Sequence, residues 1–287
     1  MRASGITPTS LSYLPACTPR LPPAALHVLN SRAGYPSGPM DLGLHGRSAI
    51  VLGASQGMGL AIAEALVDEG ANVAMFARRT EVVEREAARI GALAVPGDLT
   101  RATDLERLVT ATVGAFGGID IVVLNGGGPP PGAAADVTAA DVTAAVELLL
   151  VPHVRLVGLC LPHLRASGRG RIVAIESTSV KEPITNLALS NAVRPGVVGW
   201  LKTLARELGP DKITVNTIAP GRIDTERLRA LYGADGPPPE ALALIPARRV
   251  GSPAEIAATV CFLASVQAAY VSGAVVPVDG GMLNGLF

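Results

Sequence analysis

The 287-residue sequence has few aromatic residues and no net charge. Lys and Arg together number 24, as do Asp and Glu, so the chain lacks the basic excess through which proteins bind nucleic acids or anionic membranes. We therefore expect no nucleic-acid partner. Hydrophobic residues make up 49% of the chain although aromatic residues make up only 3%, which indicates a globular protein with a large aliphatic core.

Cysteine is also scarce. Cys17, Cys160 and Cys261 are odd in number, far apart and without CxxC spacing, which argues against a disulfide framework or a zinc site. His153 and His163 have no acid or cysteine at ligand spacing, so we interpret them as helix-packing residues and predict no metal site. Buried thiols in a reducing cytoplasm are the expectation.

The longest stretch without charge, residues 256–278, is nominally long enough to span a bilayer. Gln267, Ser272, Gly273 and Pro277 interrupt it. A buried helix followed by a buried strand explains the stretch better, and we predict no membrane segment.

Residues 1–40 differ in composition from the rest of the chain. They hold seven prolines, five serines and three arginines but no Lys, Asp or Glu, and they show no apolar periodicity. We predict a disordered extension, either without a role or acting as an organellar transit peptide. A secretory signal peptide is not expected, because the prolines interrupt the apolar region that such a peptide requires. The remainder then holds 21 basic and 24 acidic residues, which is ordinary for a soluble enzyme.

From residue 47 onward, short β-branched runs alternate with helix-length segments. The runs are apolar on both faces, which is typical of parallel strands buried between helices. Strands are predicted at 48–53, 72–77, 92–97, 119–125, 171–177, 212–219 and 274–278, and helices at 59–69, 102–116, 187–208 and 253–265. The pattern predicts an α/β fold with one doubly wound parallel sheet of about seven strands and helices on both faces, formed by residues 41–287. Ligands of such sheets bind beyond the carboxyl ends of the strands.

The first strand is followed by a glycine-rich loop and then by a helix. Small residues let a phosphate approach the backbone, and the helix N-terminus presents N–H groups to a pyrophosphate. We assign this role to the loop residues Gly53, Ser55, Gln56, Gly57, Met58 and Gly59. Glycines after a strand also occur in ordinary tight turns, so the loop alone is a weak signal.

The second strand ends at Arg78 and Arg79. An NAD-binding protein carries an acid near this point for the ribose 2′-hydroxyl, whereas an arginine pairs with the 2′-phosphate of NADP. We therefore predict NADP as the cofactor, with NAD as the alternative.

At this point the sequence resembles the short-chain dehydrogenase/reductase (SDR) family, and the resemblance covers residues 45–287. Besides the glycine loop, it rests on GDLT, NGG after the fourth strand, GRIV before Ser177, the helix GVVGWLKTLAREL, PGRIDT after the sixth strand, and VDGG near the C-terminus. The branch most similar is that of 3-oxoacyl-acyl-carrier-protein reductases. The resemblance implies a Rossmann-type fold and further cofactor contacts at Asp98, Leu99, Asn125, Gly126, Gly127, Arg194, Pro220, Gly221, Ile223 and Thr225.

The family's catalytic set is mostly replaced. Ser177 matches the serine that orients the substrate carbonyl, but Ser190 and Arg194 stand where the family has its proton-transferring tyrosine and its lysine, and Leu149 replaces a helical asparagine. Arg194 stays cationic and retains hydrogen bonds toward the ribose, whereas a serine hydroxyl is a poor acid. We assign Ser177, Ser190 and Arg194 as the catalytic residues, with the proton coming from water, Lys181 or Tyr232. For Lys181, Glu176 and Tyr232, however, a surface or packing role is the favoured interpretation.

These features support an NADP(H)-dependent oxidoreductase that transfers a hydride to or from a carbonyl or hydroxyl carbon of a small or carrier-bound substrate. One alternative is a non-redox dinucleotide-binding or sensor protein on the same fold. Another is lyase, isomerase or ene-reductase chemistry, which needs oxygen polarisation more than a phenolic acid.

The resemblance also implies a homodimer or homotetramer, paired through helices near 141–166 and 187–208. Trp200 and Leu204 would help fill that interface, although burial within the monomer explains them as well. The segment 223–246 corresponds to a substrate lid, and its Ala, Leu and Pro content suggests an apolar substrate end.

Overall fold

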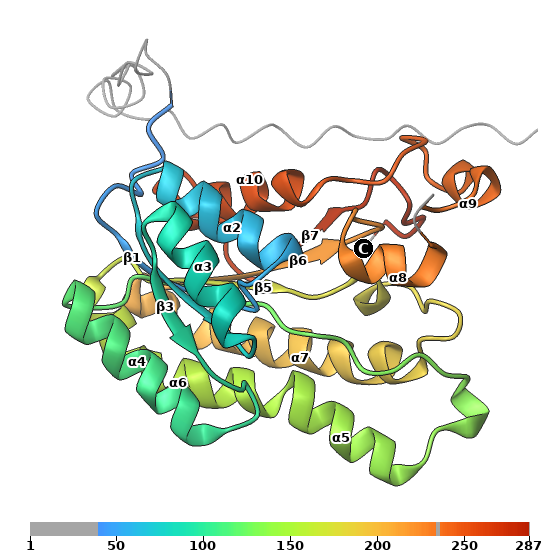
Figure 1. The fold of residues 1–287 in the computed structure, drawn as a ribbon, viewed down its shortest axis with the longest axis horizontal. Helices are drawn as coiled ribbons and strands as arrows, with labels where there is room; N and C mark the ends of the chain where they lie inside the picture. The colour runs from blue at the N-terminus through green and yellow to red at the C-terminus, as the bar shows by residue number, and fades with distance from the viewer. Residues whose placement is uncertain (1–39, 234–235, 287) are drawn as a thin grey trace, which may run out of the picture. The chain divides into compact units, whose positions relative to one another are not determined.

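Seven short strands form a single, entirely parallel sheet in the order β3-β2-β1-β4-β5-β6-β7 (Figure 1). The computed structural model describes residues 40–233 and 236–286, so the prediction of disorder for residues 1–40 lies outside them except at Met40. The strands are β1 (Ser48–Leu52), β2 (Asn72–Ala77), β3 (Leu93–Pro96), β4 (Ile121–Leu124), β5 (Arg171–Ile175), β6 (Thr214–Pro220) and β7 (Val275–Val278). Each lies within or almost within a predicted run, and the doubly wound sheet is confirmed.

The central strands are apolar on both faces because each face is covered by helices. In β1, Ile50 and Leu52 belong to one core cluster, and Ala49 and Val51 belong to the other. Successive side chains of a strand point to opposite faces, so a strand buried on both sides cannot alternate with polar residues.

Helices on the two faces of the sheet separate into two groups (Figure 1). The first cluster receives side chains from α4 (Ala102–Phe116), α5 (Ala139–Leu149), α6 (Val151–Ser167) and α7 (Ala188–Glu207). The second receives them from α2 (Gly57–Asp68), α3 (Thr80–Ile90) and α10 (Pro253–Ala264). Two short helices, α8 (Glu226–Tyr232) and α9 (Pro239–Ala243), follow β6.

The apolar stretch that carries His153 and His163 is divided into two helices. Pro152, which has no N–H to donate, lies just after the break between α5 and α6 at Leu150. Taken together, residues 139–167 are long and apolar enough to cross a membrane by length and composition alone. Their buried members, such as Leu149 and Leu156, pack into the first core cluster, which accounts for the hydropathy.

The predicted buried helix within residues 256–278 is present as α10, whereas the predicted buried strand β7 is only partly buried, with Pro277 exposed. The stretch consists of most of α10, a connection and β7. Cys160 and Cys261 are buried free thiols, and burial raises the pKa of each to about 12. Cys17 lies outside the described residues.

Candidate active site and cofactor cleft

Two adjoining clefts open at the carboxyl ends of the strands, with volumes of about 480 and 680 Å³. The smaller one, the cofactor cleft, is lined by the predicted residues Gly53, Ser55, Gln56, Gly57, Met58, Gly59, Arg78, Arg79, Asp98, Leu99, Asn125, Gly126, Gly127 and Thr225. The larger one, the substrate pocket, is lined by Ser177, Ser190, Arg194, Pro220, Gly221 and Ile223. Every residue that the sequence assigned to the site therefore borders one of the two clefts.

The glycine loop has the geometry that a phosphate-binding turn requires. Gly53 and Gly57 adopt φ angles of +62° and +56°, a region that L-residues rarely occupy. At Gly59 a Cβ would overlap the carbonyl oxygen of Gly53 and lie 2.7 Å from Nδ2 of Asn125. The loop and the end of β4 thus pack together without room for a side chain.

Asn125 connects the two strand ends that frame the cofactor cleft. Its side chain is buried, and Nδ2 donates a hydrogen bond of 3.0 Å to the carbonyl oxygen of Leu52 at the end of β1. This bond positions the Gly126–Gly127 backbone opposite the glycine loop.

The polar groups at the start of α2 fit a pyrophosphate. Gln56 caps the helix without a side-chain hydrogen bond, and the first turn contains no acidic residue. Within the described residues, Oε1 of Gln56 is buried and has no hydrogen-bond partner. The free N–H groups of a helix N-terminus attract anionic oxygens, so the cradle suits the phosphates of a dinucleotide.

At the other end of the cofactor cleft, Arg78 and Arg79 are exposed after β2 and face no acid within ion-pair distance among residues 40–233 and 236–286. Asp98 lies nearby, and its Oδ1 accepts hydrogen bonds of 2.9 Å from both the backbone N–H and the hydroxyl of Thr100. These bonds lower the pKa of the Asp98 carboxyl.

Three serines and one arginine form a largely buried hydrogen-bonded group at the floor of the substrate pocket. Oγ of Ser179 and Oγ of Ser190 lie 3.1 Å apart, and Nε of Arg194 donates to Ser190 at 3.2 Å. Oγ of Ser177 accepts the backbone N–H of Ser179 at 3.1 Å, which leaves the hydroxyl proton of Ser177 free to donate toward the pocket.

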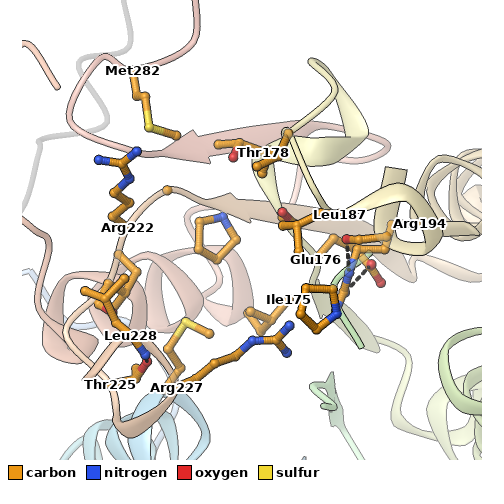
Figure 2. Close-up of a pocket in the computed structure, with 18 of the residues that line it drawn as sticks. Ile175, Glu176, Thr178, Leu187, Arg194, Arg222, Thr225, Arg227, Leu228 and Met282 are labelled. Carbon is orange, nitrogen blue, oxygen red and sulfur yellow. Dashed lines mark hydrogen bonds and ion pairs between the residues drawn. The ribbon is translucent and has the colours of Figure 1, made fainter. Parts of the chain in front are cut away.

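Arg194 is held from the opposite side by Glu176. Nη1 of Arg194 lies 2.8 Å from Oε2 of Glu176, and their side chains are 9% and 1% exposed (Figure 2). Nη2 of Arg194 also donates to the carbonyl oxygen of Gly127, which ties α7 to the cofactor cleft. Burial raises the pKa of the Glu176 carboxyl, although the Arg194 cation opposes part of that shift.

His153 lies on α6 beneath this group. It is 2% exposed, and neither ring nitrogen has a hydrogen-bond partner in the described part of the chain. Burial, assisted by the charge of Arg194, lowers the pKa of His153 to about 4. The residue is therefore a neutral packing residue at pH 7, and no metal-binding cluster of His, Cys, Asp or Glu occurs among the described residues.

The sequence did not assign Glu176, Arg222 or Arg227 to the site. Glu176 was considered only as a flanking residue, yet it is the counterion of Arg194; a lone acid at the end of a buried strand was the available signal. Arg222 and Arg227 line the substrate pocket, and Arg227 also lines the cofactor cleft. Of the two side chains considered as proton donors, Tyr232 lines the substrate pocket, whereas Lys181 lines neither cleft.

Comparison with known proteins places this geometry in a family. The profile described as enoyl-(acyl carrier protein) reductase matches residues 53–283. The 3-oxoacyl-acyl-carrier-protein reductase MabA of Mycobacterium tuberculosis is 36% identical over 236 residues, which cover 82% of this chain and 92% of the relative. The chain belongs to the short-chain dehydrogenase/reductase family. This SDR protein is an NADP-dependent oxidoreductase by membership and by the fit of its cofactor cleft.

Other SDR relatives agree with this membership. Dehydrogenase/reductase SDR family member 4 of Oryctolagus cuniculus is 34% identical, covering 83% of this chain and 94% of the relative. Among solved structures, the L-sorbose reductase of Gluconobacter frateurii in complex with NADPH and L-sorbose superimposes with a TM-score of 0.79 at 32% identity, covering 86% of this chain and all of that one.

Proposed function

We propose that this SDR protein transfers a hydride between NADP(H) and a carbonyl or hydroxyl carbon of a small or carrier-bound substrate, through Ser177, Ser190 and Arg194. The observation that carries the proposal is the convergence of these three side chains on the pocket that adjoins the cofactor cleft. One relative is named as a reductase of carrier-bound 3-oxoacyl groups and a solved neighbour as a reductase of L-sorbose, so both a carrier-bound and a small substrate are supported.

Each side chain has a role that its contacts support. When bound, NADPH would supply the hydride, and the glycine loop, Arg78 and Arg79 would hold its phosphates. Ser177 donates its hydroxyl proton in a hydrogen bond to the substrate oxygen. Arg194 adds positive charge near that oxygen and reaches the ribose side of the cleft, as its bond to Gly127 indicates.

The proton that completes carbonyl reduction comes from water or from Tyr232. Ser190 is too weak an acid for this step, and Arg194 does not release its proton. Lys181 is a weaker candidate because it lines neither cleft. Loss of general acid catalysis typically costs roughly 10² to 10⁴ in rate, so slow turnover of simple ketones is expected.

Reduction of a carbon–carbon double bond conjugated to a carbonyl is the second candidate. In that reaction the final proton reaches carbon, and the protein's main task is to polarise the oxygen. The Ser177 hydroxyl and the buried Arg194 cation meet that need, and the matching family profile is named for enoyl reduction.

The test is NADPH oxidation with a panel of ketones, 3-oxoacyl thioesters and enones, together with NADPH binding by calorimetry. We expect turnover of at least one class and at least a tenfold loss of kcat in Ser177→Ala, with NADPH binding unchanged. Ser167→Ala, on α6 outside both clefts, is the matched control. NADPH binding without turnover of any class would contradict the oxidoreductase proposal.

The double variant Ser190→Tyr/Arg194→Lys separates that result from a non-redox role. Gain of ketone reductase activity where the wild type has none would show that the fold still supports the reaction and that the wild-type site has lost its catalytic residues. Continued inactivity with intact NADPH binding would favour a dinucleotide-binding or sensor protein.

We also propose that the chain acts in the cytoplasm as a homodimer or homotetramer that pairs through α6 and α7. Val154 on α6 is 43% exposed and Trp200 on α7 is half-buried, so apolar surface remains on these helices. Sedimentation of the wild type and of Trp200→Glu tests the assembly, and a monomeric wild type would contradict it.

A further inference from the structure

The substrate pocket holds an uneven set of charges. As far as the described residues go, its charged lining consists of Glu176, Arg194, Arg222 and Arg227. Glu176 and Arg194 form a buried ion pair and together add no net charge to the lining, although the Arg194 guanidinium still acts on the groups beside it. The pocket therefore retains the two positive charges of Arg222 and Arg227, and neither forms an ion pair with any of the residues in 40–233 and 236–286.

Arg227 extends into the space between the two clefts. Its side chain reaches toward the side of the pocket where Glu176 and Arg194 lie (Figure 2). It passes so close to Gly128 that a Cβ there would lie 2.6 Å from Nη2. Partial desolvation, and then the positive charge of Arg194, lower the pKa of the Arg227 guanidinium. The Arg227 side chain is nevertheless exposed, so its N–H groups are open to a bound anion, which would offset the neighbouring positive charge.

Arg222 lines another side of the pocket from Arg227 (Figure 2). Its Nη1 donates to the carbonyl oxygen of Ala241 in α9, and its guanidinium lies 5.8 Å from the ring centroid of Tyr232. These two contacts orient a planar cation whose remaining N–H groups are available to a ligand.

The rest of the lining is mainly apolar. Ile184, Leu187, Leu228 and Met282 contribute aliphatic surface, and the pocket volume of about 680 Å³ is sufficient for a medium-sized molecule. A ligand that complements this pocket has an apolar body and a negatively charged group.

From this charge distribution we infer that the substrate is an anionic carbonyl compound, such as an oxo acid with an apolar body, whose carboxylate binds Arg227 while Arg222 adds positive charge from another side of the pocket. This inference rests on the proposed function and names the substrate class for it. Arginine forms charge-assisted hydrogen bonds with carboxylates, which are stronger than those between neutral partners.

The test compares 2-, 3- and 4-oxo acids of four to ten carbons with their neutral methyl esters. Binding to the protein saturated with NADP⁺ is measured by calorimetry, and turnover with NADPH is measured separately. We expect at least one acid to bind at least tenfold more tightly than its ester. Arg222→Gln and Arg227→Gln should each reduce that preference at least fivefold, whereas Arg229→Gln, on α8 but paired with Asp224 outside the pocket, should leave it unchanged.

Two results would overturn the inference. If no acid in the series binds more tightly than its ester, the pocket does not select an anion. If Arg227→Gln weakens NADPH binding at least tenfold while the preference for acids persists in both variants, the arginines serve the cofactor phosphates instead. Because binding is measured without turnover, a failure of the oxidoreductase proposal is recognised separately from a failure of anion selection.

Discussion

Oε2 of Glu176 accepts a hydrogen bond of 2.8 Å from Nη1 of Arg194, and the pair is buried beneath the substrate pocket. The contact joins the end of β5 to α7. It balances the charge of the buried Arg194 guanidinium. The same residue also bonds Ser190 and Gly127, so the ion pair positions the floor of the pocket relative to the cofactor cleft.

Breaking the pair from its acidic side should be more costly than breaking it from its basic side. Glu176→Leu leaves a buried guanidinium that cannot lose its proton, and we expect a loss of about 3 to 5 kcal/mol in the free energy of unfolding. In Arg194→Met the carboxyl can take up a proton, so the loss should be smaller. Urea unfolding of both variants and of the double variant measures the coupling, and an equal or larger loss in Arg194→Met would contradict this reasoning.

The exposed pair of Arg165 and Asp211 is the control for that experiment. Its atoms are also 2.8 Å apart, but the side chains are 54% and 36% exposed. Solvent screening limits such pairs to about 0 to 1 kcal/mol, so Asp211→Leu should change stability little.

Gly59→Ala should disrupt the cofactor cleft. The added Cβ would overlap the carbonyl oxygen of Gly53 and displace Asn125, because both are fixed by backbone and strand contacts. We expect NADPH affinity to fall at least tenfold and stability to fall by about 1 to 3 kcal/mol. Gly114→Ala, in α4 with no atom within 4 Å of its Cβ, should bind NADPH normally and be slightly more stable. Equal effects of the two substitutions would refute the assigned role of Gly59.

Arg78→Gln should weaken binding of NADPH but not of NADH. If Arg78 pairs with the 2′-phosphate, loss of one charge-assisted contact corresponds to about a tenfold or larger increase in the dissociation constant. Arg85→Gln on α3 removes the same charge from an arginine that already pairs with Glu86, and it should leave both affinities unchanged. A parallel loss of NADH affinity in Arg78→Gln would show that the side chain does not recognise the 2′-phosphate. Calorimetry with both nucleotides decides this.

The stability of the protein should depend on His153 between pH 6.5 and pH 4. The folded-state pKa is lowered from 6.5 to about 4, so the unfolded chain binds a proton in this range while the folded chain does not. Stability from this group is therefore fully present above pH 6.5 and is lost as pH falls toward 4, by up to about 3 kcal/mol. Arg194 is the charged group that opposes protonation in the folded state.

The corresponding measurement is the unfolding free energy of the wild type and of His153→Leu at several pH values. As the pH decreases from 7 to 4, the wild type should lose more unfolding free energy than His153→Leu, because only the wild type carries the buried imidazole. A difference that is constant from pH 7 to pH 4 would mean that folding does not lower the pKa of His153.

The sequence alone predicted the sheet because the relevant physics is local. Runs such as 48–53 are short, rich in β-branched residues and apolar on both faces, which is typical of a strand covered on both sides. The glycine loop was likewise predictable, because Gly53 and Gly57 adopt positive φ angles that few other residues tolerate. The break between α5 and α6 at Leu150 was harder to predict from the sequence, although Pro152 was a signal for it.

The charges of the substrate pocket were decided by the tertiary structure. Glu176 and Arg194 lie 18 residues apart, and their pairing depends on how α7 packs against the end of β5. Arg222 and Arg227 look like ordinary surface arginines in the sequence, because their position in a pocket depends on the path of the chain after β6. Residue type and spacing thus determined the fold and the cofactor loop by themselves, whereas the balance of charge around the substrate arises only when distant segments are brought together.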